Sequence, residues 1–218
     1  MANKADVLPI VLVTGFEPFG GSTLNPSQVI VESLAEWAGH ADAFQLTTAL
    51  LPVDTQQIVG VLDALWETHR PDIALHFGES AKAECFTLER VAINLLDFDT
   101  PDNAGQQLVD QSIDPAGEAA RFVTLPVRIL KDQLSAAGNE TSLSLSAGAY
   151  LCNQTLYLSL GHSERRGGCA VGFVHVPSLP EQVQRGERTG PAMPREQLIQ
   201  GAQRLIERSV ALFRSEKT

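Results

Sequence analysis

The feature that most constrains the fold of this chain is a regular alternation of short apolar runs with amphipathic segments. Residues 8–15 form a continuous β-branched run that ends in Gly, which is typical of a parallel strand buried on both faces. A second apolar run covers 44–53, and residues 54–70 then repeat apolar side chains at helical spacing. This order predicts βαβ units, and therefore an α/β fold with a largely parallel sheet.

The rest of the chain continues the same alternation. Further strands are expected at 72–78, 84–94, 141–146 and 169–177, and further helices at 25–39, 125–138, after Cys152 and at 194–216. Residues 97–120 are rich in Asp, Pro and Gly, and such long excursions are commonly functional. Because we find no repeat, linker or low-complexity tract, we expect one domain over residues 1–218.

The composition excludes several classes of protein. The net charge is −10, from 26 acidic and 16 basic residues, which disfavours nucleic acid and anionic membranes as partners. The three cysteines form no CxxC pair, so we expect reduced thiols rather than a disulfide framework or a structural zinc site. We find no secretory signal and no stretch near the ~20 apolar residues of a membrane span. These observations predict a cytoplasmic protein without a metal or a cofactor.

One thiol lies where its chemistry can be altered by the backbone. In "SAGAYLCNQTLYLSL" (146–160), Cys152 falls between a glycine-containing turn and the start of an expected helix. Unpaired N–H groups and the helix dipole stabilise a thiolate at that place, and the same N–H groups can bind an oxyanion. The alternative is a small buried side chain that only packs, because free cysteines are among the most buried residues.

Two residues could complete a catalytic group with this thiol. His175 ends the strand "VGFVHVP", and open α/β sheets bind ligands at that edge; the alternative is a core imidazole bonded to the backbone. Glu89 lies among apolar residues in "TLERVAIN", where its charge needs either an imidazole or an arginine as a partner. His76 also lies near a strand end and could face a cleft. The other histidines fall at expected helix ends: His40, His69 and His162.

The loop "GFEPFGG" (15–21) follows the first strand and precedes a helix, which is the position of a phosphate-binding loop. It lacks both the GxGxxG spacing and the Lys-Ser/Thr pair of such loops. Two phenylalanines between glycines fit an apolar ring better than a pyrophosphate. A loop that only closes the core is the alternative.

Five stretches together resemble the pyroglutamyl peptidase type I family, also called pyrrolidone carboxyl peptidases. They occur in the order and spacing of that family and cover most of the chain up to about residue 183. These stretches are "VTGFEPFGGSTLNPS" (13–27), "TLERVAINL" (87–95), "TPDNAG" (100–105), "SAGAYLCN" (146–153) and "GFVHVPSLPEQ" (172–182).

The resemblance implies a fold, an activity and a set of residues. The fold is a single three-layer α/β/α domain with a twisted, largely parallel sheet. The activity is that of a cytosolic, metal-free cysteine peptidase, often a homotetramer, which removes an N-terminal pyroglutamyl (5-oxoproline) residue from peptides. The implied catalytic residues are Cys152 as nucleophile, His175 as general acid and base, and Glu89 as the carboxylate that orients it. The implied substrate-binding positions are Phe16, Phe19, Asn25, Glu79, Tyr150 and Leu151.

The chain departs from the family pattern at two places. Glu79 stands where many bacterial members have Gln, and Asp99-Thr100 stands where they have Arg-Ile. An added carboxylate near the nucleophile is expected to raise the thiol pKa and to favour a cationic group on the substrate. Three hypotheses follow: a pyroglutamyl peptidase, an amidase for another N-acyl or lactam substrate, and a catalytically silent binding protein on the same fold.

Overall fold

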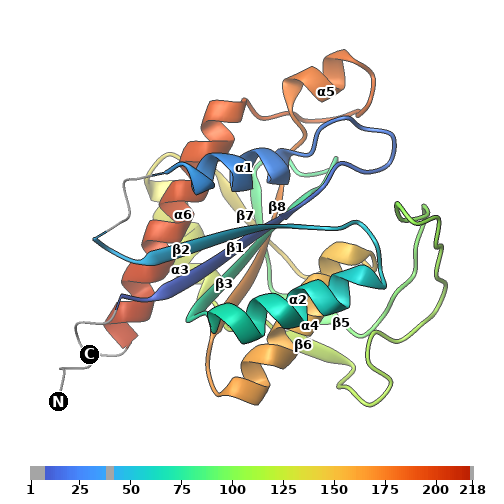
Figure 1. Cartoon of the computed structure of the whole chain (residues 1–218). Coiled ribbons are helices and arrows are strands. Elements are labelled where there is room, and N and C mark those ends of the chain that lie inside the picture. Colours follow the sequence, from blue (N-terminus) through green and yellow to red (C-terminus); the bar gives the residue numbers. More distant parts are fainter. Residues whose placement is uncertain (1–7, 38–41, 217–218) are drawn as a thin grey trace.

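The structure, a computed structural model, describes residues 8–37 and 42–216 (Figure 1). Its strands are β1 (Ile10–Phe16), β2 (Gln45–Leu51), β3 (Ile73–Glu79), β4 (Phe86–Glu89), β5 (Val91–Ile93), β6 (Ala120–Phe122), β7 (Thr141–Ser144) and β8 (Ala170–Val176). Its helices are α1 (Pro26–Ala35), α2 (Gln57–His69), α3 (Val127–Ala136), α4 (Leu151–Arg166), α5 (Pro180–Gln184) and α6 (Arg195–Glu216).

Six strands form the central sheet in the order β2-β1-β3-β8-β4-β7. The four strands β2, β1, β3 and β8 run parallel, as the apolar runs predict. β4 pairs with β8 in the antiparallel direction, and β7 pairs with β4 in parallel. The predicted largely parallel sheet is confirmed, with a reversal of direction between β8 and β4.

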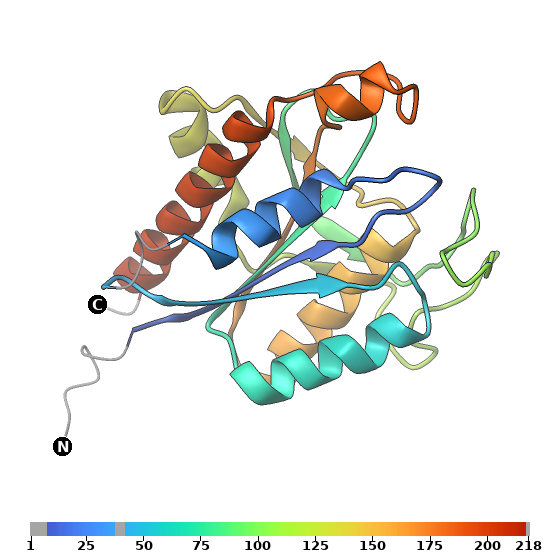
Figure 2. The ribbon, with the colours of Figure 1, turned by 45° about the horizontal axis from the view of Figure 1, so that its top comes forward.

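Helices cover both faces of this sheet (Figures 1 and 2). On one face, apolar residues of α1, α3 and α6 share a core with β1, β3 and β8. On the other face, α2 and α4 share a second core with the side chains that alternate away from the first. Trp66 of α2 and Tyr157 of α4 are fully buried in this second core. Among the described helices, none combines the length and apolarity that a membrane crossing needs.

Several element boundaries differ from the prediction. The segment 84–94 divides into β4, in the central sheet, and β5, which pairs with β6 in a separate two-stranded sheet. Helix α4 begins at Leu151, so Cys152 is its second residue and the helix does not begin after it. The first helix, α1, ends at Ala35 and is therefore shorter than the predicted 25–39; Gly39 and His40 themselves lie outside the described residues.

The start of α1 is fixed by its N-cap residue. The Asn25 side chain accepts hydrogen bonds from the backbone N–H and the hydroxyl of Ser27, at 3.0 and 2.8 Å. The Ser27 hydroxyl in turn accepts from the backbone N–H of Phe16 at 2.9 Å. Asn25 also donates its amide to the carbonyl of Glu17 at 3.0 Å. The cap therefore ties the helix to the loop that follows β1.

Candidate active site

Cys152 lies at the edge of the sheet where β1, β3 and β8 end. As the second residue of α4, it belongs to the turn whose N–H groups have no partner within the helix. Its side chain is partly exposed, whereas Cys85 and Cys169 are buried. No acidic residue lies in the first turn of α4 to oppose a thiolate. The backbone at this point therefore favours negative charge on sulfur and on an oxygen bound beside it.

Two polar residues directly after the thiol anchor the start of α4. The side-chain amide of Asn153 accepts from the N–H of Ile93 at 2.9 Å and donates to its carbonyl at 2.8 Å. Gln154 donates to the carbonyl of Thr55 at 2.9 Å and accepts from its hydroxyl at 3.0 Å. Both side chains are buried. The sequence analysis missed these positioning contacts, although two amides following a thiol were a visible signal.

His175 and Glu89 come from adjacent antiparallel strands. Thr87 is the register partner of His175, so Glu89, two residues on, projects from the same face of the sheet. The Nδ1 atom of His175 lies 2.8 Å from Oε1 of Glu89. The two side chains are 12% and 2% exposed. The structure therefore brings the predicted imidazole and carboxylate into contact away from bulk water.

The pKa of His175 reflects its two neighbours. Burial alone would lower this pKa, but the interactions of the imidazole with Cys152 and with Glu89 stabilise its charged form. Together they raise the pKa of His175 to about 10. At neutral pH the ring therefore carries two protons, with the carboxylate on one side and the sulfur on the other.

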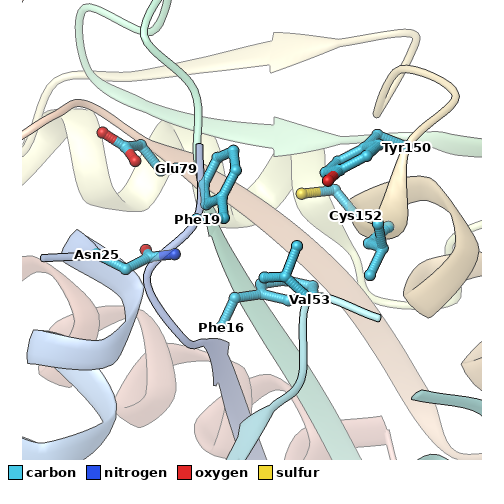
Figure 3. Close-up of a pocket in the computed structure, with 8 residues that line it drawn as sticks. Phe16, Phe19, Asn25, Val53, Glu79, Tyr150 and Cys152 are labelled. Carbon is cyan, nitrogen blue, oxygen red and sulfur yellow. The ribbon is translucent and has the colours of Figure 1, made fainter. Parts of the chain in front are cut away.

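A narrow recess, which we call the ring pocket, opens beside the thiol (Figure 3). In Figure 3 the sulfur of Cys152 points toward the space between Phe19 and Tyr150. The recess has a volume of about 240 Å³, including space open to solvent. Its lining contains all six predicted substrate-binding positions, the predicted nucleophile and Val53, which the sequence analysis missed: Phe16, Phe19, Asn25, Val53, Glu79, Tyr150, Leu151 and Cys152.

The long excursion supplies part of the support of this pocket. The ring of Phe98 packs edge-on against Tyr150, with 4.6 Å between centroids. The Tyr150 hydroxyl donates to the carbonyl of Pro101 at 3.2 Å. Burial, with smaller contributions from Asp102 and Cys152, raises the pKa of Tyr150 to about 12. Tyr150 therefore presents a neutral aromatic wall, held in place by residues of the 97–120 segment.

The two acidic residues that depart from the family pattern, Glu79 and Asp99, do not add negative charge to the site as expected. Glu79 is paired with Arg188, whose Nε lies 3.1 Å from Oε1, so it does not add an uncompensated charge to the site. Arg188 lies far along the chain, outside the motifs that the sequence analysis singled out. Asp99 is exposed and belongs to neither pocket lining. The expected cation-attracting pair of carboxylates is therefore wrong for this site.

A wider groove adjoins the ring pocket on the side of His175. It encloses about 1110 Å³, including space open to solvent. Its lining includes Cys152, His175 and Glu89 together with polar residues such as Ser80 and Ser144. The thiol therefore lies between the ring pocket and an open groove that carries several polar side chains.

The other histidines lie away from the thiol. His76 is completely buried in β3, where its Nδ1 is 2.7 Å from the hydroxyl of Thr14, so it does not face a cleft. His162 lies within α4 rather than after a helix, stacks on Trp66 and contacts Asp63 at 2.8 Å. Among the described residues, no group of three His, Cys, Asp or Glu side chains is arranged to hold a metal ion.

At one edge of the α/β sheet, a thiol at a helix start lies near an imidazole that contacts a carboxylate. This arrangement is typical of a cysteine hydrolase. A family model described as pyroglutamyl peptidase matches residues 10–211. The chain belongs to the pyroglutamyl peptidase family, and it is a cysteine peptidase of the pyroglutamyl-peptidase I type.

Individual relatives agree with this assignment. The pyrrolidone-carboxylate peptidase of Pyrococcus furiosus is 41% identical over 174 residues, which are 79% of this chain and 83% of the relative. That of Vibrio vulnificus (strain CMCP6) is 39% identical over 196 residues, 90% of each chain. A crystal structure of a mutant pyrrolidone carboxyl peptidase from P. furiosus superposes with a TM-score of 0.87 at 36% identity, covering 93% of this chain and 98% of that one. The predicted family and fold class are confirmed.

Proposed function

We propose that this chain removes an N-terminal pyroglutamyl residue from peptides, with Cys152 as nucleophile, His175 as general acid and base, and Glu89 as the residue that orients His175. The observation that carries this assignment is the 2.8 Å contact of the largely buried His175 imidazole with Glu89, in a groove that Cys152 also lines. The ring pocket directly beside the sulfur supports a compact, neutral acyl group as substrate.

The reaction follows from the charges at the site. The Cys152 thiolate attacks the pyroglutamyl carbonyl carbon, and N–H groups at the start of α4 stabilise the oxyanion. When the C–N bond breaks, the His175 imidazolium gives its proton to the leaving amine, and a thioester to Cys152 is left. His175 then takes a proton from water, whose oxygen attacks the thioester. The C–S bond breaks and pyroglutamate is released.

The two spaces around the thiol divide the substrate between them. The lactam ring lies in the ring pocket between Phe19 and Tyr150, and the leaving peptide lies in the polar groove. Oε2 of Glu79 is buried and has no hydrogen-bond partner among the described residues, so it offers an acceptor for the lactam N–H. An open glutamate side chain would bring a second carboxylate to Glu79 and would be rejected.

The test compares the wild type with Cys152→Ser on pyroglutamyl-aminomethylcoumarin, beside the prolyl and glutamyl amides. We expect hydrolysis of the pyroglutamyl amide alone, and a loss of at least about 10³-fold in the variant because the hydroxyl is a far weaker nucleophile here. Cleavage of the glutamyl or another acyl amide instead would favour a different amidase. No hydrolysis, with a thiol no more reactive than free cysteine, would favour a binding protein.

We also propose a homotetramer, one domain over residues 1–218, and a cytoplasmic location. The family resemblance suggests all three. Light scattering of the purified protein would give the mass of the assembly in solution. A mass equal to one chain would refute the tetramer without affecting the assigned reaction.

A further inference from the structure

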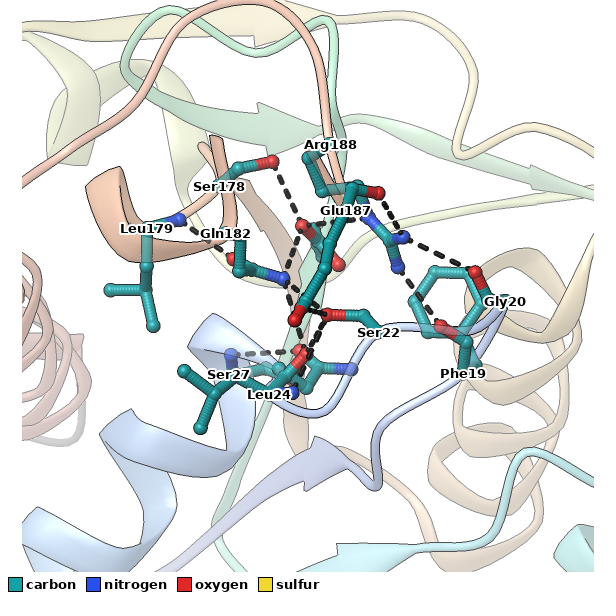
Figure 4. A network of polar contacts seen from close by, with 12 residues as sticks. Phe19, Gly20, Ser22, Leu24, Ser27, Ser178, Leu179, Gln182, Glu187 and Arg188 are labelled. Carbon is teal, nitrogen blue, oxygen red and sulfur yellow. Dashed lines mark hydrogen bonds and ion pairs between the residues drawn. The ribbon is translucent and has the colours of Figure 1, made fainter. Parts of the chain in front are cut away.

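Arg188 is a largely buried guanidinium that touches two walls of the ring pocket. It follows α5, and its side chain is 12% exposed. Its Nε donates to Oε1 of Glu79 at 3.1 Å, and the Glu79 side chain is 1% exposed. Two further donors reach the same oxygen, the Ser178 hydroxyl at 2.8 Å and the Gln182 amide at 3.1 Å (Figure 4). One carboxylate oxygen thus accepts three hydrogen bonds, and the other accepts none from the described residues.

The other end of the guanidinium holds the loop after β1. Its Nη2 donates to the carbonyl of Phe19 at 3.0 Å, and Nη1 donates to that of Gly20 at 3.5 Å (Figure 4). The guanidinium carbon lies 5.0 Å from the centroid of the Phe19 ring, in the range of a cation–π contact. Arg188 therefore joins the Phe19 wall of the pocket to its Glu79 wall.

Only an arginine can satisfy these contacts together. A buried carboxylate without a partner is costly, so Glu79 needs a positive charge beside it. The planar fork of arginine presents several donors in fixed directions, whereas lysine presents a single ammonium. A lysine would keep the charge near Glu79 but would lose the simultaneous contacts to the two loop carbonyls.

We propose that Arg188 is a positioning residue for lactam recognition: it balances the charge of Glu79 and fixes Phe19 over the ring pocket, without touching the reacting atoms. This inference rests on the proposed function, because it assumes that the ring pocket receives the lactam. It predicts that changes at Arg188 alter binding of the ring and leave the reactivity of Cys152 nearly unchanged.

The test uses 2-pyrrolidone, which fills the ring pocket but has no bond to cleave. Alkylation of Cys152 by iodoacetamide is followed by mass spectrometry, and the pyrrolidone concentration that halves its rate is determined. For Arg188→Gln we expect this concentration to rise at least about tenfold, while the rate without pyrrolidone stays within about twofold of the wild type. Arg188→Lys is expected to lie between the two proteins.

Arg185→Gln provides the matched control. Arg185 lies on the same segment and donates to the Thr23 hydroxyl at 3.0 Å, but its side chain is 54% exposed and contacts neither Glu79 nor Phe19. We expect wild-type protection by 2-pyrrolidone in this variant. An equal loss in Arg185→Gln and Arg188→Gln would show a general loosening of the loop and would overturn the proposal.

The double variant Glu79→Gln/Arg188→Gln separates charge balance from a purely structural role. Because the substitution at position 79 replaces the carboxylate with a neutral amide, that side chain no longer needs the guanidinium. The double variant should therefore bind 2-pyrrolidone more tightly than Arg188→Gln alone. Protection no better than in the single variant, or wild-type protection in Arg188→Gln, would overturn the proposal.

If Arg188→Gln fails to fold, Arg188→Lys and the double variant decide the question. Wild-type hydrolysis of the pyroglutamyl amide tests the proposed function separately.

Discussion

At the scale of single residues, the protonation state of His175 is set by its two neighbours, Glu89 and Cys152. A free imidazole has a pKa near 6.5, and burial would lower it further. Glu89 on one side and Cys152 on the other reverse that effect. The imidazolium is therefore the resting form, and in the proposed reaction the proton for the leaving amine is already in place before substrate binds.

This charge state predicts the alkaline limit of activity. An imidazolium loses its proton as the pH rises through its pKa, so kcat/KM should fall near pH 10 rather than near pH 6.5. Glu89→Gln removes one of the negative partners. The limit should therefore move to lower pH, and kcat/KM at neutral pH should fall by about 10²-fold.

The measurement is the pH dependence of kcat/KM for the wild type and Glu89→Gln, from about pH 5 to about pH 11, which covers the expected alkaline limit. The matched control is Glu84→Gln, which removes an exposed carboxylate five residues before Glu89. It should keep the wild-type profile. An alkaline limit that is the same in Glu89→Gln and the wild type would contradict the role of Glu89.

At the scale of secondary-structure elements, β3 passes so close to the thiol that one of its positions tolerates no side chain. A Cβ atom at Gly78 would lie 2.9 Å from the sulfur of Cys152 and 2.8 Å from the ring of Phe173. Gly78 is also the register partner of His175 on β8. Close approach of backbone to another group is one of the few reasons for glycine inside a strand.

Gly78→Ala should therefore displace the nucleophile. A shift of about 1 Å at a reacting atom can cost about 10²-fold in rate, so we expect kcat to fall by roughly that factor. Gly172→Ala is the control, because its Cβ would meet Leu125 at 2.7 Å instead of the site. It should lower the midpoint of thermal unfolding but retain most of the kcat. A Gly78→Ala enzyme with wild-type kcat would show that the thiol has room to move.

Gly78 also illustrates what the sequence could and could not reveal. The β-branched runs predicted the parallel strands, because burial on both faces leaves a continuous apolar pattern. Cys152, His175 and Glu89 were candidates from their positions in the chain, whereas their predicted roles and the ring-pocket residues came from family motifs. Arg188 and Gly78 were missed because their roles depend on contacts between segments far apart in the chain. β6, α5 and the break between β4 and β5 were missed because elements of three to five residues carry almost no periodicity.

At the scale of the whole molecule, the buried His76 of the central sheet makes the stability of the fold depend on pH. Its imidazole is fully buried in β3, and burial lowers its pKa to about 3. Its Nε2 has no hydrogen-bond partner among the described residues. In the unfolded chain the same group takes up a proton near pH 6.5. Between these two values the unfolded state binds more protons, so the stability from His76 is lost as the pH falls below about 6.5.

The free energy of unfolding should therefore fall on going from pH 7 to pH 5, and His76 should account for about 2 kcal/mol of that fall. His76→Gln, which cannot titrate, should lose correspondingly less over the same interval, whatever its stability at pH 7. His69→Gln, at the end of α2 and outside the sheet, should lose as much as the wild type. Urea unfolding at the two pH values gives all three differences. An equal loss in His76→Gln and the wild type would mean that the buried ring takes up its proton without unfolding the sheet around it.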